Sequence, residues 1–268
     1  MFRAKLSVVC TCLLIIGTSE LTGCSTTPVD KTAGMSPNTL YSEAKDEMKA
    51  GEWDKAVPLL EKLEGRAAGT PLAQQAQLDK AFAHYKSAES AQALATLERF
   101  MKLHPASPAM DYALYLKGII NFNSDLGMFS NITRQDLAER DQKASKESFE
   151  SFKELVTRFP DSRYSVDARQ RMNYIVSSLA QYEVHVARYY YKRSAYLAAI
   201  NRAQLAVADY RDVPAIEEAL YIIYKSYDAL GMTQLRDDAK RVLEKNYPQS
   251  DFLIKGVKQN TDPWWKVW

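Results

Sequence analysis

The chain has 268 residues and carries 35 lysines and arginines against 33 aspartates and glutamates, so its formal net charge is only +2. This length suffices for one elongated domain or two compact ones. A nearly neutral chain gives no bulk electrostatic reason to expect a nucleic-acid partner. The 3 cysteines are Cys10, Cys12 and Cys24. Residues 25–268 contain no cysteine. They therefore have no disulfide framework, no cysteine cluster for a metal and no cysteine nucleophile.

The first segment, residues 1–23, has the organisation of a secretory signal peptide. Two basic residues, Arg3 and Lys5, precede an apolar run from Leu6 to Ile16. That run is shorter than the roughly 20 apolar residues that a membrane-spanning helix needs. We therefore expect a cleaved signal rather than a transmembrane helix.

The end of this segment, Leu-Thr-Gly-Cys at residues 21–24, resembles the cleavage site of a bacterial lipoprotein signal. The resemblance implies cleavage just before Cys24, diacylglycerol on its sulfur and a third acyl chain on its new amino group. Two or more acyl chains anchor a protein stably. Residue 25 is Ser rather than Asp, which by resemblance to lipoprotein sorting implies the inner leaflet of an outer membrane rather than retention at the inner membrane. Apart from this covalent lipid we expect no cofactor and no metal; the alternative is an ordinary signal with a chance cysteine.

A repeated helical pattern follows the lipidated cysteine and a flexible, small and polar tether, together residues 24–36. From residue 37 onward helix-forming residues dominate, without the sustained alternation of a strand. Alanines twelve residues apart recur three times: Ala44 and Ala56, Ala81 and Ala93, Ala187 and Ala199. Small residues at this spacing let two helices joined by a tight turn approach closely.

Three of the expected second helices have the same type of ending. Each runs into a proline: Leu103-His104-Pro105, Arg158-Phe159-Pro160 and Asn246-Tyr247-Pro248. Proline cannot continue a helix, and it disfavours helical geometry at the residue before it. These segments therefore predict helix ends.

Together these features resemble the tetratricopeptide repeat (TPR), a helix–turn–helix unit of about 34 residues. We predict an all-α fold, an elongated and curved α-solenoid of about five TPR repeats and about ten helices. Repeats 1–3 occupy residues 37–162, repeats 4 and 5 occupy residues 163–250, and a tail covers residues 251–268. The individual units are placed at about 37–71, 72–107, 108–162, 163–213 and 214–250.

Two segments depart from the regular repeat. An insertion over about residues 123–141 contains Asn-Ser-Asp and Gly-Met-Phe-Ser-Asn runs that are typical of loops. The pattern over residues 165–192 contains neither Pro nor Gly and predicts one long helix. Two helices broken near Gln181 are the alternative.

No residue pattern indicates catalysis. The three histidines, His84, His104 and His185, have no neighbouring cysteine and no metal-ligand spacing, and no nucleophile-elbow, P-loop or dinucleotide-binding motif occurs. A stack of helix pairs instead offers a curved surface that suits an extended or helical peptide. We therefore expect a binding protein and not an enzyme.

Two groups of aromatic residues need an explanation. Tyr189, Tyr190 and Tyr191 point in different directions around a helix, so at least one should reach the groove or a neighbouring protein. The last five residues contain three tryptophans: Trp264, Trp265 and Trp268. Docking on the chain itself, docking on a partner and contact with the membrane interface are all open, and we favour docking on protein.

Residues 187–202 read ARYYYKRSAYLAAINR and resemble the signature of the BamD family, the TPR lipoproteins of the outer-membrane β-barrel assembly (BAM) machine. Residues 148–164 and the insertion before them fit the same family, and the resemblance covers the lipobox, the tether and all five repeats. It implies a non-enzymatic adaptor on the periplasmic face of the outer membrane. Its C-terminal repeats would bind the periplasmic domain of the central barrel subunit. Its N-terminal repeats would engage nascent outer-membrane proteins, and smaller accessory lipoproteins would also bind.

The resemblance also implies a partner-binding residue. In this family an Asn-Arg pair supplies an arginine to the contact with the central subunit, and the pair here is Asn201-Arg202. Arg202 is therefore the first candidate, with Asn201, Arg193 and Tyr196 as further candidates around it. A guanidinium offers a planar set of N–H donors that suits a partner carboxylate.

Two other functions are compatible with the repeats. One is a different TPR adaptor of the envelope, which coordinates cell-wall synthesis with outer-membrane constriction; only the segment 187–202 separates it from the BamD family. The other is a cell-wall hydrolase built on a helical scaffold. A hydrolase would need an acidic cleft that contains a perturbed carboxylate.

Overall fold

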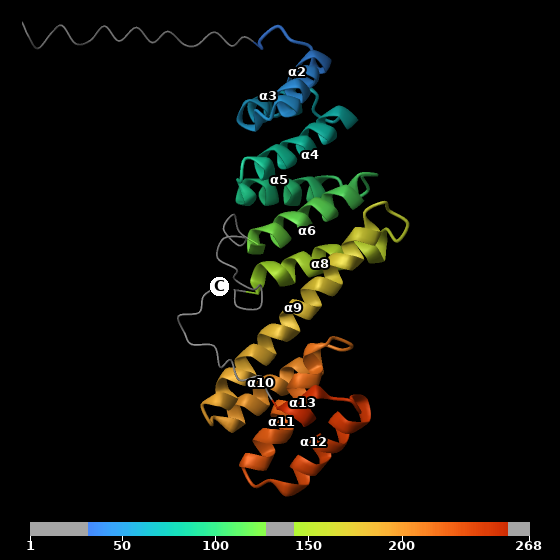
Figure 1. The fold of residues 1–268 in the computed structure, drawn as a ribbon. Coiled ribbons are helices and arrows are strands. Elements are labelled where there is room, and N and C mark those ends of the chain that lie inside the picture. The colour runs from blue at the N-terminus through green and yellow to red at the C-terminus, as the bar shows by residue number, and fades with distance from the viewer. Residues whose placement is uncertain (1–31, 127–141, 257–268) are drawn as a thin grey trace, which may run out of the picture.

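The computed structural model describes residues 32–126 and 142–256. Within these ranges the chain forms eleven helices and no strand, which confirms the predicted all-α fold. The helices stack from the N-terminus to the C-terminus into an elongated molecule (Figure 1). None of the described helices is long and apolar enough to span a membrane.

Ten of the described helices form five consecutive pairs. The first three pairs are α2 (Pro37–Ala50) with α3 (Trp53–Arg66), α4 (Pro71–Lys86) with α5 (Ser90–Leu103), and α6 (Met110–Leu126) with α8 (Lys143–Arg158). The last two are α9 (Ser165–Lys192) with α10 (Tyr196–Asp209), and α11 (Ala215–Ala229) with α12 (Thr233–Asn246); the short α13 (Asp251–Lys255) follows. The predicted solenoid of about five repeats is thus confirmed.

The paired alanines lie where the helices of each repeat meet. All six are 0% exposed: Ala44, Ala56, Ala81, Ala93, Ala187 and Ala199. A larger side chain at any of these positions would push the two helix axes apart. The twelve-residue spacing therefore predicted the register of the first, second and fourth repeats correctly.

The prolines also act as predicted. Helices α5, α8 and α12 end at Leu103, Arg158 and Asn246, two residues before a proline. The backbone N–H of the next residue in each case donates to the carbonyl four residues earlier. Each helix is thus closed by one further hydrogen bond before the proline turns the chain away.

Helix α9 connects the N-terminal and C-terminal repeats. It is one helix of 28 residues, which excludes the break near Gln181. Its first half packs with α6 and α8 through Ile175 and Leu179. Its second half packs with α10 and α11 through Val184 and Ala187. The long diagonal of α9 in Figure 1 runs between the two groups of helices, so one continuous helix sets their relative position.

The insertion in the third repeat begins later than predicted. Residues 123–126, expected to be loop, form the end of α6. Phe122 packs into the neighbouring core, and the Asn123 side chain donates a hydrogen bond to the Tyr85 hydroxyl. These tertiary contacts outweigh the low helix propensity of Asn, Ser and Asp. Residues 127–141 lie outside the described part of the chain.

The last residues of the predicted tether are docked on the first repeat. Arg66 donates to the carbonyl oxygens of Thr32 and Met35 at 2.7 and 2.9 Å, and Lys62 donates to the Thr32 hydroxyl at 2.9 Å. Thr32 is only 8% exposed. The prediction of a flexible tether is therefore wrong for residues 32–36. The signal segment, Cys24 and the rest of the tether lie outside the described residues.

The predicted tail likewise begins with a structured turn. Residues 251–255 form α13, and the Phe252 ring lies 5.8 Å from the Tyr221 ring, centroid to centroid. This contact holds α13 against α11. The three tryptophans of the tail lie outside the described residues, so their docking stays a prediction.

Candidate partner-binding site

The four candidate residues lie at the turn between α9 and α10 and along α10. The chain reverses between Lys192 and Tyr196, and Ser194 in this turn has a positive φ of 60°. Buried Ala199 then keeps α10 close to α9. This geometry places Arg193 and Tyr196 near the turn and Asn201 and Arg202 farther along α10.

Arg193 and Tyr196 lie beside the three consecutive tyrosines. The Arg193 guanidinium lies over the Tyr189 ring, 4.5 Å from its centroid, and Tyr189 is 48% exposed. Tyr191 meets Tyr196 edge to face at 5.9 Å, and Tyr190 and Tyr191 pack against the buried core. Burial raises the pKa of the Tyr191 hydroxyl. One exposed and two packed tyrosines agree with the expectation that at least one would leave the core.

Asn201 and Arg202 face different directions. Asn201 is exposed, as are Leu197 and Leu205, whose exposed fractions are 61% and 44%. Because residues four apart share a helix face, these three form one outward stripe. Arg202 instead turns toward α9, where its Nη1 donates to Glu183 Oε2 at 3.2 Å.

Arg202 is therefore not a free surface charge. Its side chain keeps 41% of its surface exposed, whereas the side chain of Glu183 is 12% exposed. A guanidinium has five N–H donors, so the bond to Glu183 leaves others for a partner. The sequence resemblance identified Arg202 but not Glu183, which is 19 residues earlier in the chain.

A second ion pair in the C-terminal repeats has no signal in the sequence. Arg188 of α9 donates to both oxygens of Glu218 of α11, at 2.5 and 2.6 Å. The hydrogen bond and charge of Glu218 raise the pKa of Arg188. The pair borders a hollow of about 850 Å³ between α9, α11 and α13. The ion pair joins α9 of the fourth repeat to α11 of the fifth.

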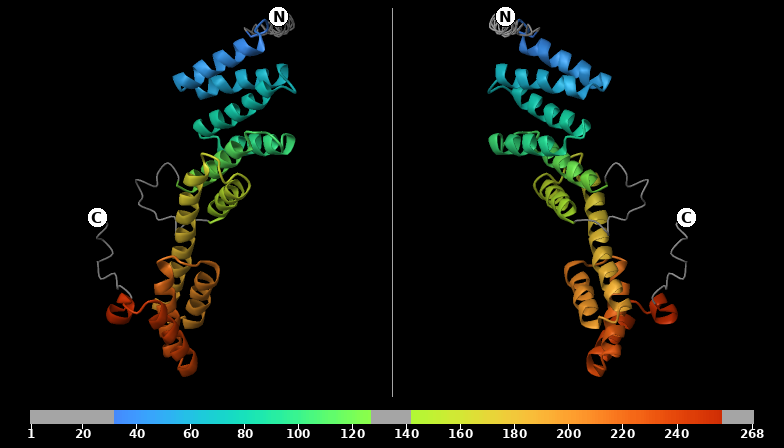
Figure 2. Two further views of the ribbon diagram at one scale, coloured as in Figure 1. Left: turned by 90° about the vertical axis from the view of Figure 1, so that its right-hand side faces the viewer. Right: turned by 90° about the vertical axis from the view of Figure 1, so that its left-hand side faces the viewer.

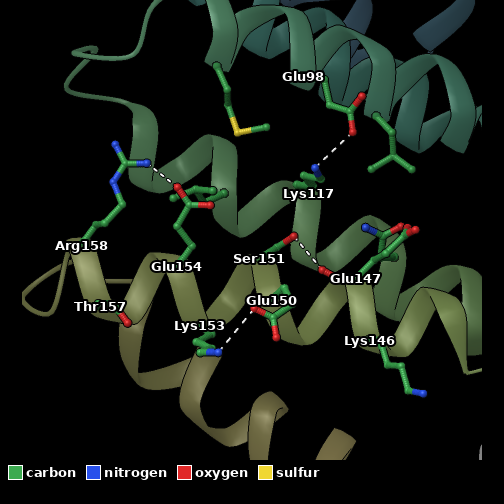
Figure 3. A pocket seen from close by; sticks show the side chains of 14 residues that line it. Glu98, Lys117, Lys146, Glu147, Glu150, Ser151, Lys153, Glu154, Thr157 and Arg158 are labelled. Carbon is green, nitrogen blue, oxygen red and sulfur yellow. Dashed lines mark hydrogen bonds and ion pairs between the residues drawn. The ribbon is translucent and has the colours of Figure 1, made fainter.

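The N-terminal repeats carry a separate groove of about 680 Å³ among α5, α6 and α8 (Figure 3). Its apolar lining includes Leu94, Met101 and Leu114. Six of its eight charged lining residues pair with one another: Lys117 with Glu98, Lys153 with Glu150, and Arg158 with Glu154. An apolar floor with neutralised charges suits a peptide better than a highly charged small molecule.

The chemistry of these hollows differs from that of a hydrolase. Both contain lysines or arginines beside their carboxylates, unlike an acidic cleft. Among residues 32–126 and 142–256, no group of three or more His, Cys, Asp or Glu side chains is arranged to hold a metal ion. His84 lies 2.6 Å from Glu89, an interaction within the second repeat.

Comparison with known proteins assigns the chain to a family. The model of the YfiO family, described as "Outer membrane lipoprotein", matches residues 33–243. The outer membrane protein assembly factor BamD of Neisseria meningitidis is 45% identical over 253 residues, which are 92% of this chain and 95% of that protein. The chain belongs to the BamD family. The BamD of Vibrio cholerae is 35% identical over 87% of this chain and 96% of that protein.

These BamD relatives confirm the resemblance first seen at residues 187–202, and they favour it over a different TPR adaptor of the envelope. A solved structure of a Podosopora anserina putative kinesin light chain with TPR-like repeats is 14% identical and aligns with a TM-score of 0.36 over 80% of this chain and 99% of that one. A TM-score this low is no evidence for a shared fold, so the fold is assigned from the helix pairs of this chain alone.

Proposed function

We propose that this BamD-family protein is a non-enzymatic adaptor in the assembly of outer-membrane β-barrel proteins. Its C-terminal repeats bind the periplasmic domain of the central barrel subunit, and accessory lipoproteins are further partners. The observation that supports this most directly is Arg202, half-exposed within the segment that resembles the family signature. Exposed Tyr189, Arg193 and Asn201 lie near it, at the end of α9, in the turn and on α10.

The N-terminal repeats engage nascent outer-membrane proteins in this proposal. The groove in Figure 3 supports the assignment, because its apolar floor can take side chains of a peptide that is not yet folded. No cofactor and no nucleic acid take part.

Cys24 is the proposed site of lipid attachment, in the inner leaflet of the outer membrane. Replacing Cys24 by Ser should abolish labelling by a fatty-acid analogue and leave an uncleaved or soluble precursor, because serine lacks the sulfur that accepts diacylglycerol. Cys12→Ser, within the signal segment, is the matched control and should keep the label. An unmodified N-terminus in the mature native protein, measured by mass spectrometry, would contradict the assignment.

Replacing Arg202 by Glu should weaken binding of the central barrel subunit by about 30-fold or more. Loss of one member of a hydrogen-bonded charge pair at an interface costs on the order of 2–5 kcal/mol. Arg202→Leu should have a smaller effect, because it removes the guanidinium without repelling a partner carboxylate or Glu183. Affinity is measured in detergent by surface plasmon resonance at low salt, where charge effects are largest.

The control for this experiment is Arg241→Glu on α12. The Arg241 side chain is 74% exposed and pairs with its neighbour Asp238 on the same helix. This variant should bind normally, and all three variants should keep their helix content in circular dichroism. Unchanged affinity of the Arg202→Glu protein would remove Arg202 from the interface.

A further inference from the structure

The hollow between α9, α11 and α13 lies away from the candidate residues on α10. Figure 2 shows α13 and α10 on opposite sides of α9. The hollow has a volume of about 850 Å³, within the range of about 300–1,000 Å³ in which protein pockets enclose a drug-sized molecule. Its lining includes Arg188, Tyr189 and Lys192 of α9, Glu217 of α11, and Phe252 and Gly256 at the end of the described chain.

This hollow combines aromatic rings with charged groups that are not engaged in ion pairs within the described part of the chain. The Tyr189 side chain is 48% exposed, and Phe252 is only partly buried. Among residues 32–126 and 142–256, no oppositely charged group lies at ion-pair distance from Lys192 or from Glu217. The lining therefore offers ring surfaces, an ammonium group and a carboxylate to an occupant.

A tryptophan side chain matches each of these groups. The face of an indole attracts a cation more strongly than the ring of Tyr or Phe does, so it suits the Lys192 ammonium. Its edges and faces pack against other rings, here those of Tyr189 and Phe252. Its Nε1–H can only donate and needs an acceptor when it is buried, which the Glu217 carboxylate provides. The hollow is thus complementary to an indole.

The chain itself brings tryptophans to the edge of this hollow. Gly256, which belongs to the lining, has a φ of 74° and ends α13, and the Phe252 ring holds α13 on Tyr221. Trp264 and Trp265 follow Gly256 by eight and nine positions. Eight residues span at most about 29 Å, so this stretch is long enough to leave α13 and return to the hollow. The preceding Asp-Pro dipeptide at residues 262–263 favours a turn.

We infer that the tail, residues 257–268, docks in this hollow of its own chain. An indole of the Trp264-Trp265 pair lies between Tyr189 and Phe252, with its face toward Lys192 and its Nε1–H donating to Glu217. A group tethered by a short linker has an effective concentration in the millimolar range, which favours this site over one on a separate molecule. The docked tail ties α13 to α9 and α11, so it closes the C-terminal end of the solenoid. This inference goes beyond the proposed function, because the occupant belongs to the same chain.

Tryptophan fluorescence of the full lipidated protein in phospholipid vesicles tests this docking. The sequence contains 4 tryptophans, so Trp53→Phe leaves only those of the tail as emitters. In this background the tail emission should be protected from acrylamide compared with the urea-unfolded protein. Tyr189→Ala and Glu217→Ala should each raise the quenching constant by about 2-fold or more, because each removes a contact of the docked indole.

Tyr174→Ala is the matched control. Tyr174 lies on the same helix as Tyr189 and is 47% exposed, but it contacts Phe122 rather than the hollow. This variant should leave the quenching constant of the tail unchanged. Circular dichroism of every variant distinguishes a lost contact from a lost fold.

Three results would overturn the inference. Equal quenching of the folded and unfolded protein would show that the tail is not docked. Quenching by brominated phospholipids, with no effect of Tyr189→Ala or Glu217→Ala, would place the tryptophans in the membrane interface. Protection that appears only after addition of the periplasmic domain of the barrel subunit would place them on that partner. Because none of these measurements involves Arg202, failure of the tail docking would leave the proposed function intact.

Discussion

Replacing Gly118 by Ala should lower the free energy of unfolding by about 1–3 kcal/mol, although alanine is ordinarily the better helix former. Gly118 lies inside α6, and a Cβ at this position would approach three atoms of the Phe152 ring closer than 3.0 Å. Phe152 of α8 is 0% exposed, so its ring can move only by displacing other buried atoms. The Ser148 hydroxyl donates to the Gly118 carbonyl at 2.9 Å, which shows how closely α8 approaches this backbone.

Gly65→Ala is the matched control for this prediction. Gly65 is the next-to-last residue of α3, and a Cβ there would meet nothing within 4 Å. This variant should be more stable than the unmodified protein by up to about 1 kcal/mol, from helix propensity alone. Urea unfolding followed by circular dichroism measures both changes. Equal effects at Gly65 and Gly118 would show that the Phe152 ring does not crowd a side chain at position 118, whereas partial rescue of Gly118→Ala by Phe152→Leu would support this crowding.

Local patterns in the sequence predicted the helix pairs because each pattern acts over a short stretch of chain. The buried alanines such as Ala93 and Ala199 mark close helix contacts, and Pro105 and Pro160 mark helix ends. The predicted start of the insertion was wrong because Asn123 is held in α6 by a tertiary contact with Tyr85. From the sequence alone, Gly118 indicates a weak point in a helix. In the structure, its missing side chain makes room for the ring of Phe152, 34 residues later in the chain.

The candidate site was only partly predictable, because its charge partners lie far apart in the sequence. Family resemblance pointed to Arg202, but a charge partner 19 residues away leaves no periodic signal. Likewise, only the packing of α11 against α9 brings Glu218 to Arg188, 30 residues away in the chain. Lys80 of α4 is a further residue whose burial the sequence does not indicate. In the sequence it resembles a solvent-exposed lysine, and only the packing of α3 and α5 around α4 buries it.

Glu64 and Lys80 form a buried ion pair at the contact of α3, α4 and α5. Lys80 Nζ lies 2.8 Å from Glu64 Oε2, and the two side chains are 6% and 16% exposed. Gln77 and Arg99 donate to the other oxygen of Glu64 at 3.0 and 2.5 Å. Burial raises the pKa of Glu64, but the hydrogen bonds and charges of Lys80 and Arg99, with the bond from Gln77, lower it below its ordinary value of 4.5.

The lowered pKa gives this pair a defined pH dependence. A carboxylate whose pKa is lower in the folded state contributes stability that is fully present above its unfolded pKa. For Glu64 this contribution should be complete above about pH 4.5 and should be lost as the pH falls through the lower, folded value. In variants without Glu64, the free energy of unfolding should lack this part of its decrease at acid pH.

Replacing Glu64 by Leu should lower the free energy of unfolding by about 3–5 kcal/mol, the cost of leaving a buried charge without its partner. Glu61 lies 3.7 Å from Lys80 but is 69% exposed, so water screens it and it cannot replace Glu64. Adding Lys80→Met should recover most of the loss, because apolar residues often replace a buried ion pair without destabilising a protein. Denaturant unfolding of the two single variants and the double variant gives the coupling energy directly. A double variant as unstable as Glu64→Leu would mean that Lys80 reaches water without its partner, and that the loss comes from the other contacts of Glu64, with Gln77 and Arg99.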